Sequence, residues 1–189
     1  MRIWILLGSL LPLKMEEIEV KILDIDPENV RISLKKAGAK LNKNVFQRNF
    51  IFSNKLTKSK DLTVRVRQEN DKVWLAIKTP KIKENGHETC EEYEFPIDNI
   101  EIGEKFLNTL DITMDGIGEA KREYYDLFDC SVEIIKIPKI PEYLEIDGSK
   151  INIMKVTKVL GFTEKDFFQG SLLKNYNIKE KFLAFNHKQ

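Results

Sequence analysis

Residues 16–22 read EEIEVKI, and the pattern in this stretch decides the fold. Glu17, Glu19 and Lys21 alternate with apolar residues, and a period of two is typical of a β-strand whose successive side chains point to opposite faces. In an open sheet the charged row would face water. Whether it does so here, or faces the inside of a closed sheet, depends on the other strands of the chain.

The composition is that of an ordinary globular protein. Of 189 residues 42% are hydrophobic, which is enough for a core and excludes global disorder. The 31 basic and 30 acidic residues leave a formal net charge of +1, so we expect neither nucleic acid nor membrane as a partner. Two cysteines without metal-finger spacing are typical of a reducing compartment, and we predict a cytoplasmic location.

The first 14 residues, MRIWILLGSLLPLK, differ from the rest of the chain. Their apolar stretch is too short to span a bilayer and lacks the small-residue cleavage site of a signal peptide. We interpret residues 1–14 as a leader or a misassigned start, with an extra packed strand and a targeting segment as alternatives. Residues 15–189 are predicted to form a single domain with a partly helical C-terminal segment.

About eight strand candidates follow one another along the chain, with helices between some of them. The expected helix N-caps are Asp26, Asp98 and Ser149, and two of the helices should end near Gly38 and Gly161. Because successive strands are joined by short turns, the sequence favours an α+β protein with an antiparallel sheet or barrel over a doubly wound fold.

Most of the predicted strands carry a charged row, and the paired positions are of one sign. The pairs are Glu17 and Glu19, Arg65 and Arg67, Glu92 and Glu94, and Glu145 and Asp147, with Lys78 and Arg122 on further strands. Like charges side by side are unfavourable on a wet face, so the segregation favours a closed sheet with these rows inside. An open sheet with one wet face is the simpler alternative.

A charged interior needs ligands, because buried charges are costly unless they are paired or bound. An eight-stranded barrel leaves room for side chains and one small ligand. Carboxylates suit a hard divalent cation such as Mg²⁺, and Arg and Lys suit the oxygens of a phosphate chain.

Seven segments resemble, in chain order, the strand motifs of the CYTH family of triphosphate tunnel metalloenzymes. They are EIEVK, FQRNFIF, LTVRVR, LAIK, EEYEF, REYY and YLEID, and the first matches the E-x-E-x-K signature of the family. The resemblance covers most of residues 15–162. It implies a closed eight-stranded antiparallel β-barrel with helices packed outside, which holds a triphosphate along its axis.

The resemblance also implies roles for single residues. The metal ligands for Mg²⁺ or Mn²⁺ would be Glu17, Glu19, Glu92, Glu94, Glu145 and Asp147. The residues that bind the triphosphate would be Lys21, Arg65, Arg67, Lys78 and Arg122. Glu17, Glu19 and Lys21 would take part in catalysis.

Four positions depart from the family pattern. Cys90, Ala120, Ile135 and Asn49 stand where the family has Arg, Lys, Asp and Asp. Basic residues that could compensate are Lys81, Lys83, Lys136 and Lys139.

Three functions follow as hypotheses. The first is a metal-dependent enzyme of the class IV adenylate cyclase type, which converts ATP to cyclic AMP and pyrophosphate, with thiamine triphosphatase or inorganic tripolyphosphatase as close alternatives. The second is a non-catalytic module that binds a nucleotide or polyphosphate, and the third is a sheet-based interaction domain. A homodimer is left open.

We further predict that His87 lies in a surface loop, that Trp74 packs as core under a helix, and that the lysine run Lys78–Lys83 is a solvated loop or a lid.

Overall fold

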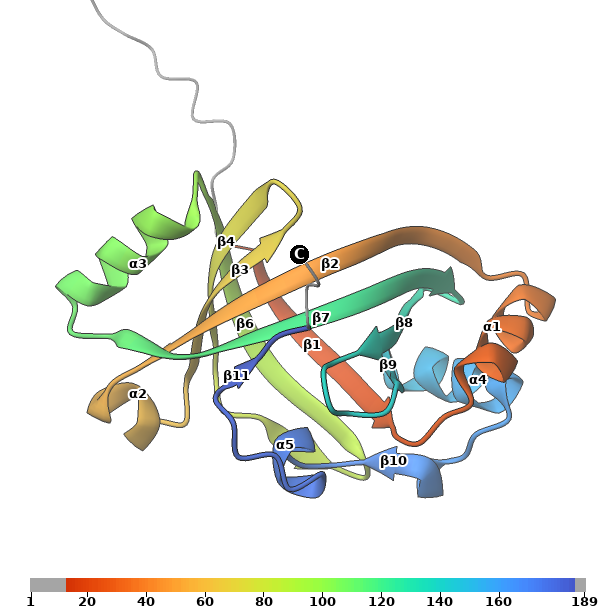
Figure 1. Cartoon of the computed structure of the whole chain (residues 1–189). Helices are drawn as coiled ribbons and strands as arrows, with labels where there is room; N and C mark the ends of the chain where they lie inside the picture. The colour runs from red at the N-terminus through yellow and green to blue at the C-terminus, as the bar shows by residue number, and fades with distance from the viewer. Residues whose placement is uncertain (1–12, 186–189) are drawn as a thin grey trace, which may run out of the picture.

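The computed structural model describes residues 13–185, and the side chains of residues 18–185. Eight long strands close into a barrel (Figure 1). They are β1 (Leu13–Ile22), β2 (Lys40–Ser53), β3 (Thr63–Glu69), β4 (Lys72–Lys78), β6 (His87–Ile97), β7 (Thr113–Leu127), β8 (Cys130–Lys136) and β9 (Tyr143–Asp147). Their order around the barrel is β1-β9-β8-β7-β2-β3-β4-β6, and β6 pairs again with β1. The predicted closed antiparallel barrel is confirmed.

Three short strands extend the barrel at its edges. β5 (Ile82–Glu84) pairs with β6, and β10 (Phe167–Phe168) pairs with β1. β11 (Phe182–Leu183) lies parallel to β7.

The helices lie outside the barrel, with α1 and α4 side by side and α3 at the opposite end (Figure 1). They are α1 (Pro27–Lys36), α2 (Lys55–Ser59), α3 (Ile100–Thr109), α4 (Lys150–Leu160) and α5 (Leu172–Asn175), with a 3₁₀ turn, η1, at Glu164–Asp166. Asp26 and Ser149 accept the predicted N-cap hydrogen bonds. The cap of α3 is Asn99, and not Asp98 as predicted, because Asn99 accepts the backbone N–H of Ile102.

The apolar rows of the strands point outward and are covered by these helices. Val20 and Ile22 of β1 are fully buried in a cluster with Leu34 of α1 and Ile153 of α4. The charged row of β1 therefore faces the interior, where Glu19 and Lys21 are only 4% and 8% exposed. This excludes the open sheet with one wet face.

One end of the barrel interior is filled by apolar side chains from the C-terminal segment. Ala120, Ile135 and Tyr143 lie two positions from charged interior residues on their strands, and they cluster with Leu172 and Tyr176. α5 lies at the end of the barrel away from the β3–β4 turn (Figure 1). The charged interior is thus reached from the side of that turn.

Candidate functional site

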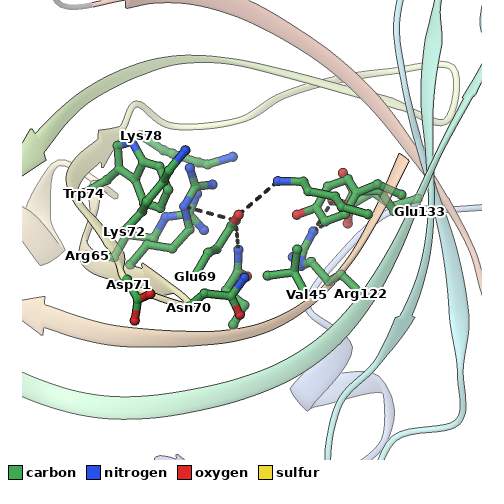
Figure 2. Close-up of a pocket in the computed structure, with 15 residues that line it drawn as sticks. Val45, Arg65, Glu69, Asn70, Asp71, Lys72, Trp74, Lys78, Arg122 and Glu133 are labelled. Atoms are coloured by element: carbon green, nitrogen blue, oxygen red, sulfur yellow. Dashed lines mark hydrogen bonds and ion pairs between the residues drawn. The ribbon is translucent and has the colours of Figure 1, made fainter. Parts of the chain in front are cut away.

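A cavity of about 500 Å³ occupies the barrel interior next to the β3–β4 turn (Figure 2). Its basic lining residues are Lys43, Arg65, Arg67, Lys72, Lys78 and Arg122. Its acidic lining residues are Glu69, Asp71, Glu133 and Glu145. Most of the basic residues come from β3 and β4, whereas Glu133 and Glu145 come from β8 and β9 on the facing wall. Basic residues therefore predominate on the wall of β3 and β4, apart from Glu69 and Asp71, and carboxylates on the facing wall, apart from Arg122.

The basic wall is neutralised in part by β6. Arg65 and Lys78 lie 2.9 Å and 3.1 Å from the carboxylate oxygens of Glu92, and Arg67 lies 2.6 Å from Glu94. Burial alone would raise the pKa of Glu92, but Arg65 and Lys78 outweigh it and hold this pKa below its usual value. Burial raises the pKa of Glu94, which Arg67 opposes only in part. Glu92 is thus an ionised counterion of the basic wall.

Glu69 lies between the two walls of the cavity (Figure 2). Its carboxylate accepts hydrogen bonds from Gln47 at 2.8 Å and from Lys43 at 3.0 Å, and Arg67 lies 3.7 Å away. Burial favours a higher pKa for Glu69, but Lys43 and Arg67 lower it. Glu69 therefore ties β2 to the end of β3 at the mouth of the cavity.

The acidic wall holds three carboxylates close together. One oxygen from each of Glu133, Glu145 and Asp147 lies within 4.8 Å of the others. Glu133 and Glu145 are directly opposite each other in the β8–β9 ladder, which explains their approach. Arg122 lies 2.6 Å from Glu133 and 3.6 Å from Glu145. Three carboxylate oxygens at this spacing are a donor set that a hard divalent cation prefers.

A second buried carboxylate pair, Glu19 of β1 and Glu88 of β6, lies beside the first group. Lys21 contacts both and is 3.0 Å from Glu88, and it is also 3.9 Å from Glu145. Lys81 contacts both as well, at 2.7 Å from Glu88. Burial alone would raise the pKa of Glu19, but the ammonium groups of Lys21 and Lys81 hold it far below its usual value.

The structure brings together almost all of the residues that the sequence predicted for the site. Inside the barrel lie Glu19, Lys21, Arg65, Arg67, Lys78, Glu92, Glu94, Arg122, Glu145 and Asp147. The side chain of Glu17 lies outside the described residues. The acids form separate groups: Glu92 and Glu94 pair with the basic wall, whereas Glu145 and Asp147 join Glu133.

Sequence reasoning missed three acids of the interior. Glu69 follows Arg65 and Arg67 on the same face of β3, and Glu88 precedes Cys90 and Glu92 on the same face of β6. Glu133 shares its face of β8 with the uncharged Ser131 and Ile135, so no charged row marks it in the sequence. Continuing each charged row by two residues along its strand would have found Glu69 and Glu88.

The altered family positions have packing roles. Ala120 and Ile135 are 4% and 0% exposed in the apolar cluster at the closed end of the barrel. The Lys and Asp that the family has at these two positions would be charged groups among apolar side chains. Asn49 donates to Gln47 at 3.0 Å. Lys136 and Lys139 pair with Glu142 and Glu180 near the surface, whereas Lys81 does enter the interior.

Two further predictions are wrong. His87 is only 6% exposed, since its ring meets that of Phe167 edge-on, with centroids 5.5 Å apart. Trp74 lines the cavity, with the Arg67 guanidinium 5.1 Å from its ring centroid, because its position on β4 has interior parity.

A closed barrel whose interior segregates acidic from basic side chains defines a charged-tunnel protein. A family model described as the CYTH domain matches residues 15–149, and the chain belongs to this family. The resemblance predicted from the sequence is confirmed. A comparison with curated proteins finds no match.

Solved structures share the fold. The PH1012 protein of Pyrococcus horikoshii OT3 aligns with a TM-score of 0.73 and 22% identity, over 85% of this chain and 98% of that one. A Vibrio parahaemolyticus protein described as a candidate adenylate cyclase gives a TM-score of 0.70 and 10% identity, over 86% and 98% of the two chains. HpAC1 from Hippeastrum, described as revealing a dominant triphosphatase activity, aligns with a TM-score of 0.64 and 17% identity, over 86% of this chain and 95% of that one.

Among residues 13–185, no helix has the length and apolar character that crossing a bilayer requires. The cytoplasmic location, the homodimer and the domain limits stay predictions.

Proposed function

We propose that this tunnel binds the phosphate chain of a triphosphate and cleaves it with the help of a divalent metal ion. The observation that carries the proposal is the segregation of charge in one cavity. Arg65, Arg67 and Lys78 line one wall, and the carboxylates of Glu133 and Glu145 line the other. A phosphate chain with its counter-cation is a ligand that satisfies both walls at once.

The basic residues would hold the phosphate oxygens. Arg65 and Arg122 each have a buried Nε atom without a hydrogen-bond partner among the described residues. A buried donor left unsatisfied costs about 1–3 kcal/mol, and an anionic oxygen in the cavity would remove this cost. Arg67 and Lys78 would add charge along the same wall, and Lys21 would contribute from β1.

The acidic residues would hold the metal ion, Mg²⁺ or Mn²⁺. Glu133, Glu145 and Asp147 form the group that fits such an ion best, because their oxygens converge. Glu17 and Glu19 are proposed as further ligands from β1. Glu92 and Glu94 remain weaker candidates, because they already form ion pairs with basic residues of β3 and β4. When bound, the ion would neutralise charge on the phosphate oxygens.

The first candidate reaction is the conversion of ATP to cyclic AMP and pyrophosphate. Trp74 and Tyr124 line the cavity on its open side, and aromatic faces there suit a nucleobase. The ribose 3′-oxygen would attack the α-phosphorus, the bond from that phosphorus to the α–β bridging oxygen would break, and pyrophosphate would leave. The hydroxyl proton would pass to solvent through the mouth.

The second candidate is hydrolysis, in which a water oxygen attacks phosphorus, a phosphoanhydride bond breaks and the proton passes to solvent. The likeness to HpAC1, which is described as having a dominant triphosphatase activity, supports it. Thiamine triphosphate and inorganic tripolyphosphate are the alternative substrates.

The test is to incubate the purified chain with ATP, thiamine triphosphate or tripolyphosphate, with Mg²⁺ or Mn²⁺ and with a chelator as control. Cyclic AMP with pyrophosphate would support the first reaction, and phosphate release without cyclic AMP the second. A triphosphate-induced rise in melting temperature without product would support the non-catalytic module. If there is neither product nor a melting shift, the tunnel does not bind triphosphates.

A further inference from the structure

Lys81 reaches the acidic interior from the short connection between β4 and β5. This connection is at the opposite end of β4 from the cavity mouth. Its side chain is 33% exposed, whereas the side chains of its partners Glu19 and Glu88 are 6% and 3% exposed. The ammonium group therefore reaches from the surface to a carboxylate pair that is otherwise enclosed.

This carboxylate pair is already matched in charge. Lys21 and Lys81 each contact both Glu19 and Glu88, so two ammonium groups face two carboxylates. Lys83 lies further out, 3.7 Å from Glu88. The other acidic group has three converging carboxylates, Glu133, Glu145 and Asp147, and Arg122 contacts two of them. The two acidic groups thus differ in the number of carboxylates, three against two.

The backbone around Lys81 is held on both sides, while its side chain is free to withdraw. Thr79 donates to the Glu91 carbonyl at 2.9 Å, and Ile82 pairs with Thr89 in the β5–β6 ladder. Glu84 of β5 is joined to Lys150 of α4 at 2.6 Å. Because the partly exposed stem of Lys81 has four methylene groups, its ammonium can move into water without any change in the backbone.

We propose that Lys81 is a tethered ammonium that fills a cation position between Glu19 and Glu88, and that it must withdraw before a divalent ion can bind to this pair. The inference rests on the proposed metal dependence of the tunnel. On this proposal the first divalent ion binds to the group of Glu133, Glu145 and Asp147. The Glu19–Glu88 pair is then a second, weaker site, whose affinity is set by competition with Lys81.

The test measures Mn²⁺ binding to the full chain by the electron paramagnetic resonance signal of free Mn²⁺, with no substrate present. The variant is Lys81→Met, which keeps the stem and removes the charge. The matched control is Lys139→Met, because Lys139 pairs with Glu180 and contacts neither acidic group. We expect the second Mn²⁺ to bind at least tenfold more tightly in Lys81→Met than in the wild type, and Lys139→Met to resemble the wild type. A Lys81→Met isotherm that overlays the wild-type one would overturn the proposal.

Thermal unfolding gives a second readout, because removal of Lys81 leaves the two buried carboxylates with less positive charge, from Lys21 and the more distant Lys83. Lys81→Met should melt lower than the wild type without Mn²⁺ and rise further when Mn²⁺ is added, whereas Lys81→Arg should behave as the wild type. Equal Mn²⁺-induced shifts in all three chains would count against the proposal. If neither the wild type nor Lys81→Met binds Mn²⁺, the metal dependence itself fails. If the wild type binds and Lys81→Met is unchanged, only the role of Lys81 fails.

Discussion

Arg122 Nη1 lies 2.6 Å from Glu133 Oε2, and this contact joins the two kinds of charge in the tunnel. Burial disfavours a charged guanidinium, but Glu133 and Glu145 more than offset this and raise the pKa of Arg122. Arg122 therefore stays a cation at the edge of the acidic wall. A phosphate group bound to it would lie next to the carboxylates proposed to hold the metal ion.

Replacing Arg65 by alanine should weaken triphosphate binding at least tenfold. Arg65 supplies a buried, unsatisfied Nε and a guanidinium in the cavity, and hydrogen bonds to charged groups contribute about 1.5–3 kcal/mol each. The measurement is the rise in melting temperature caused by tripolyphosphate. Arg48→Ala is the control, because Arg48 lies 3.1 Å from Glu119 and does not line the cavity. An undiminished shift in Arg65→Ala would count against the proposed phosphate site.

Replacing Glu145 by glutamine should lower the affinity of the first Mn²⁺ site by more than tenfold, while the protein stays folded. The change keeps the shape of the side chain and removes one of three converging carboxylates. Glu142→Gln is the matched control, since Glu142 is joined to Arg31 and Lys136. Calorimetric titration with Mn²⁺ would measure both variants. Equal affinities would place the metal elsewhere.

Replacing Trp74 by alanine should raise the KM for ATP but not the KM for inorganic tripolyphosphate. Stacking of a base on an aromatic side chain contributes about 1–3 kcal/mol, so the KM for ATP should rise by about tenfold or more. Tripolyphosphate has no ring, and its KM should stay the same. Phe106→Ala serves as control, because Phe106 is an exposed residue of α3. A parallel rise for both substrates would show that Trp74 only shapes the cavity.

Strand parity favoured a charged interior over a charged face in water, and the family resemblance then implied the closed barrel. Glu19 and Lys21 are indeed buried. The caps at Asp26 and Ser149 were also predictable, since an N-cap depends on residues within three positions.

The partners of the charged residues could not be predicted, because they depend on register and on distant segments. Glu133 meets Glu145 only in the observed β8–β9 pairing. Ile135 is covered by Leu172 and Tyr176, which are far away in the sequence. Lys81, which precedes β5, meets Glu19 of β1. Local patterns contain no information on such contacts, which arise when the sheet closes.

Stability should fall steeply as the pH drops below about 4, near the usual pKa of a glutamate. Basic partners lower the native-state pKa of Glu19, Glu69, Glu88 and Glu92, despite their burial. The unfolded chain therefore takes up protons first, so this stabilisation is full above the unfolded pKa and is lost as the pH falls through the native values. The midpoint urea concentration of unfolding, measured at several pH values from 7 to 3, would report this loss of stability.

Two variants test which carboxylates cause this dependence. Glu92→Gln cannot titrate, so its midpoint should depend less on pH than that of the wild type. Glu94 has a raised native pKa because of its burial, and its contribution has the opposite sign. Glu94→Gln should therefore make the loss at low pH steeper. Identical slopes in both variants would contradict the assignment.

Replacing Gly86 by alanine should destabilise the protein by clearly more than replacing Gly38. Both glycines have left-handed backbones, with φ of 84° and 81°, so both variants share a strain of about 1 kcal/mol. A Cβ on Gly86 would lie 2.7 Å from Cδ2 of Phe167, whereas a Cβ on Gly38 would have no atom within 4 Å. The difference between the two variants therefore isolates the contact of the β5–β6 turn with Phe167.

Urea unfolding of the two single variants and of the double variant Gly86→Ala/Phe167→Ala would measure this contact. We expect Gly86→Ala to be less stable than Gly38→Ala by at least about 1 kcal/mol, the lower range for overpacking. In the Phe167→Ala background, Gly86→Ala should cost no more than Gly38→Ala does in the wild type, because the ring that it meets is gone. Phe167 also packs on His87 and pairs with Ile22, so its displacement would loosen the C-terminal segment from the turn that follows Lys81. Equal costs for Gly86→Ala and Gly38→Ala would mean that the turn and the C-terminal segment are not in contact in solution.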